Sequence, residues 1–219
     1  MGYNMRMRFS KTGKAKYISH LDLMATMRRA LLRAGIELKY SEGFNPHPYM
    51  SVALPLPVGC GSLCELMDVE LAGASIPCVS PGIITAVLPE GLEVVEAYKP
   101  ERKFSGIVWL EMHGILYYKN GAPPDAADRL ADRFRAESII ISKKTKRGAS
   151  DIDLASFIRD VEFFENGGLN MKAKVFAQNP TISADNLISA LEAGFSAFKP
   201  DFALFTRTEI FDGDMRVFR

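Results

Sequence analysis

Few of the 219 residues are cysteine, and no long apolar run occurs in the chain. The cysteines are Cys60, Cys64 and Cys78, an odd number with no export signal, which does not predict a disulfide framework. The sequence around Cys60 and Cys64 offers no further ligands, so we expect neither a metal site nor another resident cofactor. No stretch approaches the roughly 20 apolar residues of a membrane helix. Arg6 and Arg8 interrupt the apolar amino terminus, where a signal peptide needs an apolar core. We therefore expect a cytoplasmic protein without membrane association.

A net charge of +1 conceals a strong asymmetry between two neighbouring segments. Residues 1–50 carry nine Lys and Arg residues and three acidic residues, whereas residues 51–101 carry one Lys and seven acidic residues. Two interpretations follow. The basic segment binds an anionic ligand, or the two segments complement each other when the chain folds.

Hydrophobic periodicity predicts an α+β fold. In residues 3–9 apolar and polar side chains alternate as in a strand, and Met24, Met27 and Leu31 follow at helical spacing. Ser19 is a suitable N-cap for this helix, with Asp22 three residues later. Further elements are predicted as strands at 49–54, 63–71 and 92–98 and a short helix at 80–88. The order β-α-β-β-α-β is that of a ferredoxin-like unit.

The second half repeats this order. We predict strands at 106–118, 138–144, 168–176 and 202–211, and helices at 124–136 and 183–194. Residues 150–166 do not fit the repeat and are interpreted as an insertion. The sequence therefore predicts tandem ferredoxin-like halves, residues 1–101 and 102–219, with the insertion in the second half.

The most specific motifs lie in residues 8–58 and read RFSKTG, YISHLDLM, RRALLRAGI, YSEGFNPHP and SVALPLPVG. They resemble the family of radical SAM-linked proteins, and residues 198–213, FKPDFALFTRTEIFDG, resemble that family's carboxyl-terminal strand. Members of this uncharacterised family are fused to, or encoded beside, a cobalamin-binding radical SAM protein, often near genes for a ribonuclease and ribosomal proteins. The resemblance implies a radical SAM partner and an RNA setting, but no reaction.

The chain lacks the C-x-x-x-C-x-x-C motif that a radical SAM enzyme carries. We therefore expect an accessory or substrate-presenting protein for such a partner, in RNA modification. Whether the chain is itself an enzyme stays open at this point.

Two segments within the resemblance are candidates for a site. His20 lies in the first helical turn on the expected core-facing stripe, where a helix amino terminus favours a neutral imidazole. It is interpreted either as a proton acceptor or as a partly buried structural histidine. The loop 40–48 is interpreted either as a rigid binding loop or as turns between strands. Its candidate ligand-binding residues are Tyr40, Phe44 and Asn45, and His47 is a second candidate catalytic residue.

We expect these two segments to meet. The chain leaving the helix must return to start the next strand, and nine extended residues can span about 30 Å. The prediction is a shared pocket lined by His20, Asn45 and His47, with Tyr40 and Arg8 as neighbours.

A basic surface is the basis of the alternative function, an RNA-binding protein or a metal-independent endoribonuclease that uses His20. Its phosphate-binding candidates are Lys11, Lys14, Lys16, Arg29 and Arg33. The competing interpretation is an ordinary solvated helix face.

Overall fold

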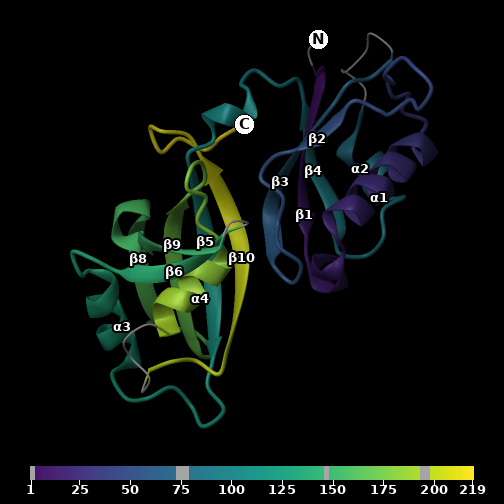
Figure 1. The fold of residues 1–219 in the computed structure, drawn as a ribbon. Helices are drawn as coiled ribbons and strands as arrows, with labels where there is room; N and C mark the ends of the chain where they lie inside the picture. Colours follow the sequence, from purple (N-terminus) through teal and green to yellow (C-terminus); the bar gives the residue numbers. More distant parts are fainter. Residues whose placement is uncertain (1–2, 73–78, 146–147, 193–197) are drawn as a thin grey trace. The chain divides into compact units, whose positions relative to one another are not determined.

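The computed structural model describes residues 3–72, 79–145, 148–192 and 198–219 (Figure 1). The chain divides into two compact units. Unit 1 comprises Met1–Gly106 together with Arg219, and unit 2 comprises Ile107–Phe218. The division predicted from the sequence lies between residues 101 and 102.

Unit 1 is built on an antiparallel sheet. Strand β1 pairs with β3 on one side and β4 on the other, and β2 pairs with β3, so the order is β4-β1-β3-β2. In chain order the elements are β1 (Met5–Lys11), the 3-10 helix η1 (Gly13–Tyr17), α1 (His20–Arg33), β2 (Met50–Val52), β3 (Gly61–Val69), α2 (Pro81–Thr85), β4 (Leu92–Tyr98) and the 3-10 helix η2 (Phe104–Gly106).

The alternation seen in the sequence of β1 gives its two faces different roles. Met5, Met7 and Phe9 are fully buried in a core that also contains Met27 and Leu31 of α1. Arg6 and Arg8 project to the other face, because successive side chains of a strand point to opposite sides. The core of unit 1 therefore lies between α1 and one face of the sheet.

Helix α1 begins and ends as its sequence predicts. The Ser19 Oγ accepts a hydrogen bond from the Asp22 amide at 3.1 Å and caps the first turn. Gly35, just beyond the last turn, has a φ of +74°, a left-handed conformation that stops a helix and that glycine adopts without strain.

Unit 2 contributes four antiparallel strands paired in the order β10-β5-β9-β8. A separate two-stranded sheet joins β6 to β7. In chain order the elements are β5 (Trp109–Tyr117), α3 (Ala126–Phe134), β6 (Ile140–Thr145), β7 (Gly148–Asp153), the 3-10 helix η3 (Leu154–Phe157), β8 (Ile158–Glu165), β9 (Leu169–Phe176), α4 (Ala184–Glu192) and β10 (Phe202–Phe211).

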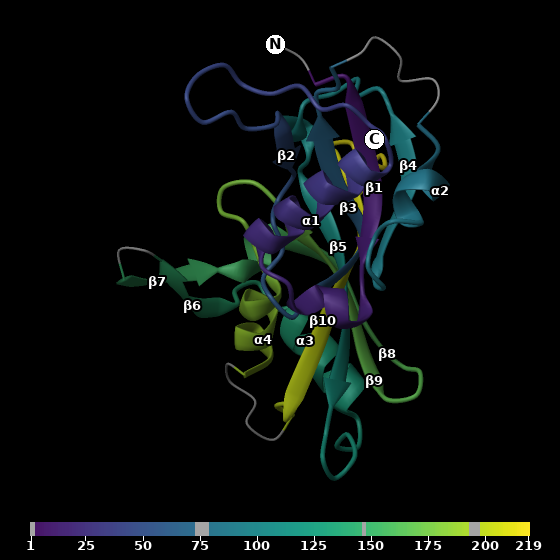
Figure 2. The same ribbon diagram turned by 90° about the vertical axis from the view of Figure 1, so that its right-hand side faces the viewer.

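The predicted position of the insertion is wrong. Residues 150–166 include β8, which pairs with β9 in the main sheet, whereas the strand predicted at 138–144 belongs to the β6–β7 hairpin (Figure 2). The hairpin segment has the apolar pattern of a sheet strand because it also packs on apolar residues. Ile139 and Ile141 are buried, as is Leu154 just after the hairpin. Alternation alone does not tell which strand a segment pairs with.

The fold is thus α+β, with antiparallel strand pairs and few helices. Within the part of the chain that the structure describes, none of the helices has the length and apolar character needed to cross a membrane.

Candidate functional site on the first unit

His20 is solvent-exposed, contrary to the expectation of partial burial. The buried stripe of α1 starts one turn later, at Leu23, and both residues after His20, Leu21 and Asp22, are also exposed. The first turn therefore projects beyond the sheet, and helical spacing by itself did not reveal where the sheet ends.

The loop 40–48 closes on itself. Tyr40 and Pro48 form an isolated β-bridge, the Ser41 amide donates to the His47 carbonyl at 2.8 Å, and the His47 amide donates to the Ser41 Oγ at 3.0 Å. Between them Phe44 is fully exposed, and Tyr40, Asn45 and His47 also face solvent. The loop is thus closed by backbone contacts at its base and displays its side chains to solvent.

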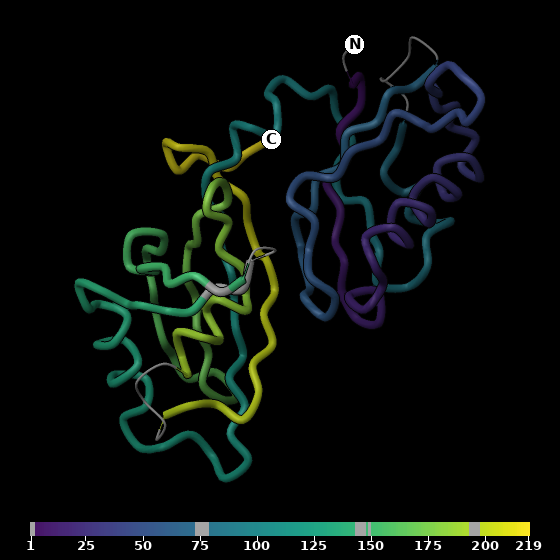
Figure 3. Tube along the Cα trace, viewed as in Figure 1, coloured from purple at the N-terminus to yellow at the C-terminus, as the bar shows by residue number. Residues whose placement is uncertain are grey.

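The structure does not bring His20 and this loop together. Met50, where the loop re-enters the sheet, is paired with Val69, which is also the partner of Met5 at the start of β1. The segment leading to His20 leaves the opposite end of β1, about 20 Å away at 3.3 Å per residue. The loop and the start of α1 stand apart in the view that Figures 1 and 3 share and in the turned view of Figure 2. The predicted shared pocket is therefore wrong in its geometry, because Leu38 pairs with Leu71 directly after the helix and the chain never returns along α1.

Two of the predicted binding residues are buried. Lys11 is almost inaccessible, and its Nζ donates to the carbonyls of Lys16 at 3.3 Å and Ile18 at 3.2 Å. Burial lowers the pKa of this ammonium, opposed in part by the charge of Glu65. Lys11 supports the segment before α1, so its assignment to a phosphate-binding surface is wrong. Arg8 is also buried, within the sheet.

The other basic residues stay on the surface. Lys14, Arg28, Arg29 and Arg33 are exposed, while Lys16 is half-buried with its Nζ 5.1 Å from the centroid of the Tyr17 ring. The Arg33 guanidinium donates to the Val87 carbonyl at 2.7 Å. Arg28 and Arg29 make no ion pair with another described residue, so their charges are available to a ligand or partner.

A feature that sequence reasoning missed is an apolar stripe on the outward side of α1. Leu21 is 77% exposed and Leu32 is 48% exposed. At 100° per residue, Leu21, Arg28 and Leu32 lie within about 40° of one another and about 100° to 140° around the helix from the buried Met27. We call these three residues the outward stripe. The sequence did contain a signal for this stripe, since Leu21 and Leu32 do not share the helical face of Met24, Met27 and Leu31.

The face of the sheet opposite α1 carries a buried ion pair. The Arg6 guanidinium, which is 0% exposed, makes two bonds to the Asp68 carboxylate, Nε to Oδ1 at 2.6 Å and Nη2 to Oδ2 at 2.9 Å. It also donates to the Arg102 carbonyl at 2.8 Å and lies 4.5 Å from the centroid of the Phe104 ring. Beside the pair is a cavity of about 320 Å³, lined by Tyr3, Asp68, Pro100, Glu101, Arg102, Lys103 and Phe104.

This pair supports the second interpretation of the charge asymmetry. Arg6 belongs to the basic segment and Asp68 to the acidic one, and a further pair joins Lys39 to Glu70. The Glu70 carboxylate raises the pKa of Lys39 through a hydrogen bond and its charge. Part of the asymmetry thus reflects ion pairs that join β1 to β3, and the segment after α1 to the residue that follows β3.

Among the described residues no cluster of histidine, cysteine and acidic side chains is placed to hold a metal ion. Cys60 and Cys64 are buried free thiols, and Cys78 lies outside the described residues.

Comparisons with known proteins concern the fold and the family of the chain. No curated protein matches the chain. Among solved structures it is similar to the crystal structure of a Cbf5-Nop10-Gar1 complex, with a TM-score of 0.51 and 10% identity over 95% of this chain and 49% of that chain. The chain therefore spans about half the length of that relative, and the likeness concerns the fold alone.

A second similar structure, that of an unknown protein from Galdieria sulphuraria, has a TM-score of 0.28 and 9% identity over 94% of this chain and 99% of that chain. The family model described as "Uncharacterized protein conserved in bacteria (DUF2344)" matches residues 4–187. The chain belongs to this conserved bacterial family, DUF2344.

Proposed function

We propose that this protein is an accessory module that docks onto a radical SAM protein through the outward stripe of α1. The observation that carries the proposal is the exposure of Leu21 and Leu32 on the solvent side of an amphipathic helix whose opposite side already fills the core. The exposed parts of these leucines add nothing to the packing of the helix. Complete burial of an exposed Leu side chain is worth about 1.5 to 3 kcal/mol, and a partner gains the share that is still exposed.

The surroundings of the stripe have the composition of a protein interface. Arg28 lies within the stripe and Arg29 beside it, and Tyr17, just before the helix, is also exposed. Arginine and aromatic residues are enriched in interfaces and among their energetic hot spots. A partner of complementary shape and acidic rim fits this surface.

The nature of the partner comes from the sequence resemblance. The motifs YISHLDLM and RRALLRAGI form most of α1, and YSEGFNPHP forms the displayed loop 40–48. Those segments resemble radical SAM-linked proteins, and they supply exposed residues as well as residues of the hydrophobic core. A docking role accounts for specific residues on an exposed surface.

The test is binding to a cobalamin-binding radical SAM protein from the same organism, purified with its cluster. Changing Leu21 and Leu32 together to Asp should weaken binding at least tenfold in calorimetry, because two apolar contacts are replaced by charges that must be desolvated. The matched control is Ile83→Asp on α2, since Ile83 is similarly exposed in the same unit. Equal affinity of the double variant and the control would contradict the proposal.

A second candidate, RNA binding, is favoured by the exposed guanidinium groups of Arg28 and Arg29. If it is correct, changing Lys14, Arg29 and Arg33 together to Ala should flatten the salt dependence of binding by roughly one unit of log-log slope per lost phosphate contact. An unchanged salt slope would show that α1 does not contact the RNA backbone. For an endoribonuclease, His20→Ala should abolish cleavage without altering the melting temperature, because His20 is exposed.

We also infer that both units are ferredoxin-like. The orders β4-β1-β3-β2 and β10-β5-β9-β8 correspond strand for strand once the β6–β7 hairpin is set aside. In each, two helices connect strands in the order β-α-β-β-α-β. This correspondence supports a tandem arrangement, with the insertion at residues 140–153.

A further inference from the structure

The sheet of unit 2 has one covered face and one that carries aromatic side chains. Leu110, Met112 and Leu116 of β5 are buried on the covered face. On that same side Phe134 of α3 packs against Phe163 of β8, with ring centroids 5.5 Å apart. The alternate residues of β5, including His113 and Tyr117, project to the opposite face.

At one end of this opposite face two aromatic rings lie side by side. Tyr117 of β5 is the direct antiparallel partner of Phe202 of β10, and their ring centroids are 6.0 Å apart. The two residues are 45% and 57% exposed, and Ile115 beside them is also exposed. Together they form a broad apolar surface on the strands. Aromatic rings displayed on a sheet in this way are platforms on which unpaired bases stack.

Next along the face is a fixed hydrogen-bonding group. The Asn170 amide nitrogen donates to the carbonyls of Asn166 at 3.1 Å and Gly168 at 2.7 Å, which fixes its orientation. Its Oδ1 therefore faces the Nε2 of His113, at 3.0 Å, and Nε2 must be the donor. The imidazole is held further by stacking on Phe164. This arrangement leaves the His113 Nδ1 as an acceptor for the edge of a base.

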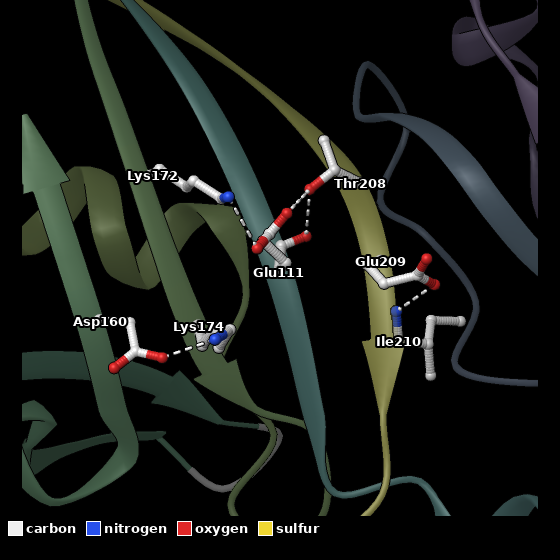
Figure 4. A network of polar contacts seen from close by, with 7 residues as sticks. All are labelled: Glu111, Asp160, Lys172, Lys174, Thr208, Glu209 and Ile210. Carbon is white, nitrogen blue, oxygen red and sulfur yellow. Dashed lines mark hydrogen bonds and ion pairs between the residues drawn. The ribbon is translucent and has the colours of Figure 1, made fainter. Parts of the chain in front are cut away.

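Cations flank the aromatic rings. Lys119 follows Tyr117 at the end of β5, and the nearby Asp201 carboxylate accepts a hydrogen bond from the Lys119 amide at 2.7 Å. Lys172, opposite His113, is 45% exposed at its side chain and pairs with Glu111 at 3.1 Å. Figure 4 shows Glu111 held between Lys172 and Thr208, whose Oγ1 donates to it at 2.8 Å. Glu111 is thus engaged, whereas Glu162 of β8, the direct partner of Lys172, is exposed on the same face. Lys119 and Lys172 are the cations that suit one or two phosphates.

We propose that this face of unit 2 binds single-stranded nucleic acid, with two unpaired bases stacked on Tyr117 and Phe202 and a base edge contacting His113. Lys119 and Lys172 contact the backbone. Because few free cations are involved, affinity comes mainly from stacking. The site is separate from the docking surface on α1, and it stands or falls independently of the radical SAM partner.

The experiment measures fluorescence anisotropy of the full-length protein with labelled eight-nucleotide RNA, DNA of the same sequence, and the corresponding duplex. We expect binding to the single strands and little to the duplex, whose bases are already stacked. Tyr117→Ala and Phe202→Ala should each weaken binding roughly tenfold or more, whereas Tyr117→Phe, which keeps the ring, should retain it. The RNA and DNA arms show whether the 2′-hydroxyl contributes.

The matched control is Ile140→Ala, a similarly exposed apolar residue of the β6–β7 hairpin, which should bind as the wild type does. The log-log salt slope should be shallow, roughly −0.7 to −1.4 for one or two phosphate contacts. Wild-type affinity in the Tyr117→Ala and Phe202→Ala variants, or equal binding of duplex and single strand, would overturn the proposal. So would the absence of binding at protein concentrations up to about 100 µM, since a stacking platform that weak serves no recognition.

Discussion

Tyr98, at the end of β4, holds a hydroxyl group in an environment that favours its neutral form. The hydroxyl is buried and has no hydrogen-bond partner among the described residues. Burial raises its pKa from 10.0 to about 12, although the nearby Arg6 charge acts in the opposite direction. Tyr118 in unit 2 has a pKa raised to about 12 for the same reason, but its hydroxyl donates to the Phe198 carbonyl at 2.8 Å.

These two tyrosines give a matched prediction. At pH 7, Tyr98→Phe should be neutral or slightly stabilising, whereas Tyr118→Phe should lose about 1 kcal/mol with its hydrogen bond. A folded-state pKa above the unfolded value means stability that is complete below pH 10 and is lost as pH rises toward 12. Tyr98→Phe should therefore reduce the alkaline loss of stability, measured by urea unfolding at several pH values. An equal alkaline loss in wild type and variant would show that this phenol titrates normally.

The ion pair of Arg6 and Asp68 makes a second prediction at this scale. Asp68→Asn should destabilise unit 1 by about 3 kcal/mol, because the guanidinium stays buried without its carboxylate. Arg6→Met combined with Asp68→Leu should recover most of that loss, since apolar residues of similar volume can replace a buried pair. Urea unfolding monitored by circular dichroism compares the three proteins. A double variant less stable than Asp68→Asn would mean that attraction within the pair contributes more to the stability of unit 1 than burial of a lone charge costs.

At the level of elements, α1 has two apolar faces with different tasks. The inner face packs Leu23, Met27 and Leu31 on the sheet, while the outward stripe faces solvent. Truncating neighbouring residues of α1 should therefore change the free energy of unfolding by very different amounts.

Leu31 and Leu32 test this difference directly. Leu31→Ala should cost roughly 2 to 5 kcal/mol, because Leu31 is fully buried and its truncation leaves a cavity. Leu32→Ala should stay within about 0.5 kcal/mol of wild type, as exposed positions do. Thermal unfolding of the two single variants is sufficient, and similar losses for both would show that the outward stripe is packed in solution.

For the whole molecule, the single tryptophan provides a probe of one unit. Trp109 is the only tryptophan in the sequence, and it is buried in unit 2 against Phe176 and under the Arg159 guanidinium, at 3.8 Å. Each unit has its own hydrophobic core, so we expect Met27→Ala in unit 1 to lower the transition seen by circular dichroism while leaving the tryptophan transition unchanged. Coincident shifts in both signals would show that the two units unfold as one cooperative body.

Local patterns in the sequence were sufficient for much of the architecture. The alternation of Met5, Met7 and Phe9, the Ser19 cap and the Gly35 stop each depend on residues close in sequence, and all three are found in the structure. For the loop 40–48 the sequence left two interpretations open, and the exposure of Phe44 was decided by the fold. The misplaced insertion shows the limit, because pairing partners are chosen by contacts far along the chain.

Tertiary structure alone decided which residues meet. Lys11 was predicted as a surface cation, yet the fold buries it beneath the segment before α1. The segments that carry His20 and His47, predicted to share a pocket, lead from opposite ends of β1. Tyr117 and Phe202, 85 positions apart in the chain, are direct neighbours. The sequence by itself determined the elements and their faces, since these depend on periodicity. Their neighbours depended on strand register and on where each helix ends relative to the sheet, which no local pattern encodes.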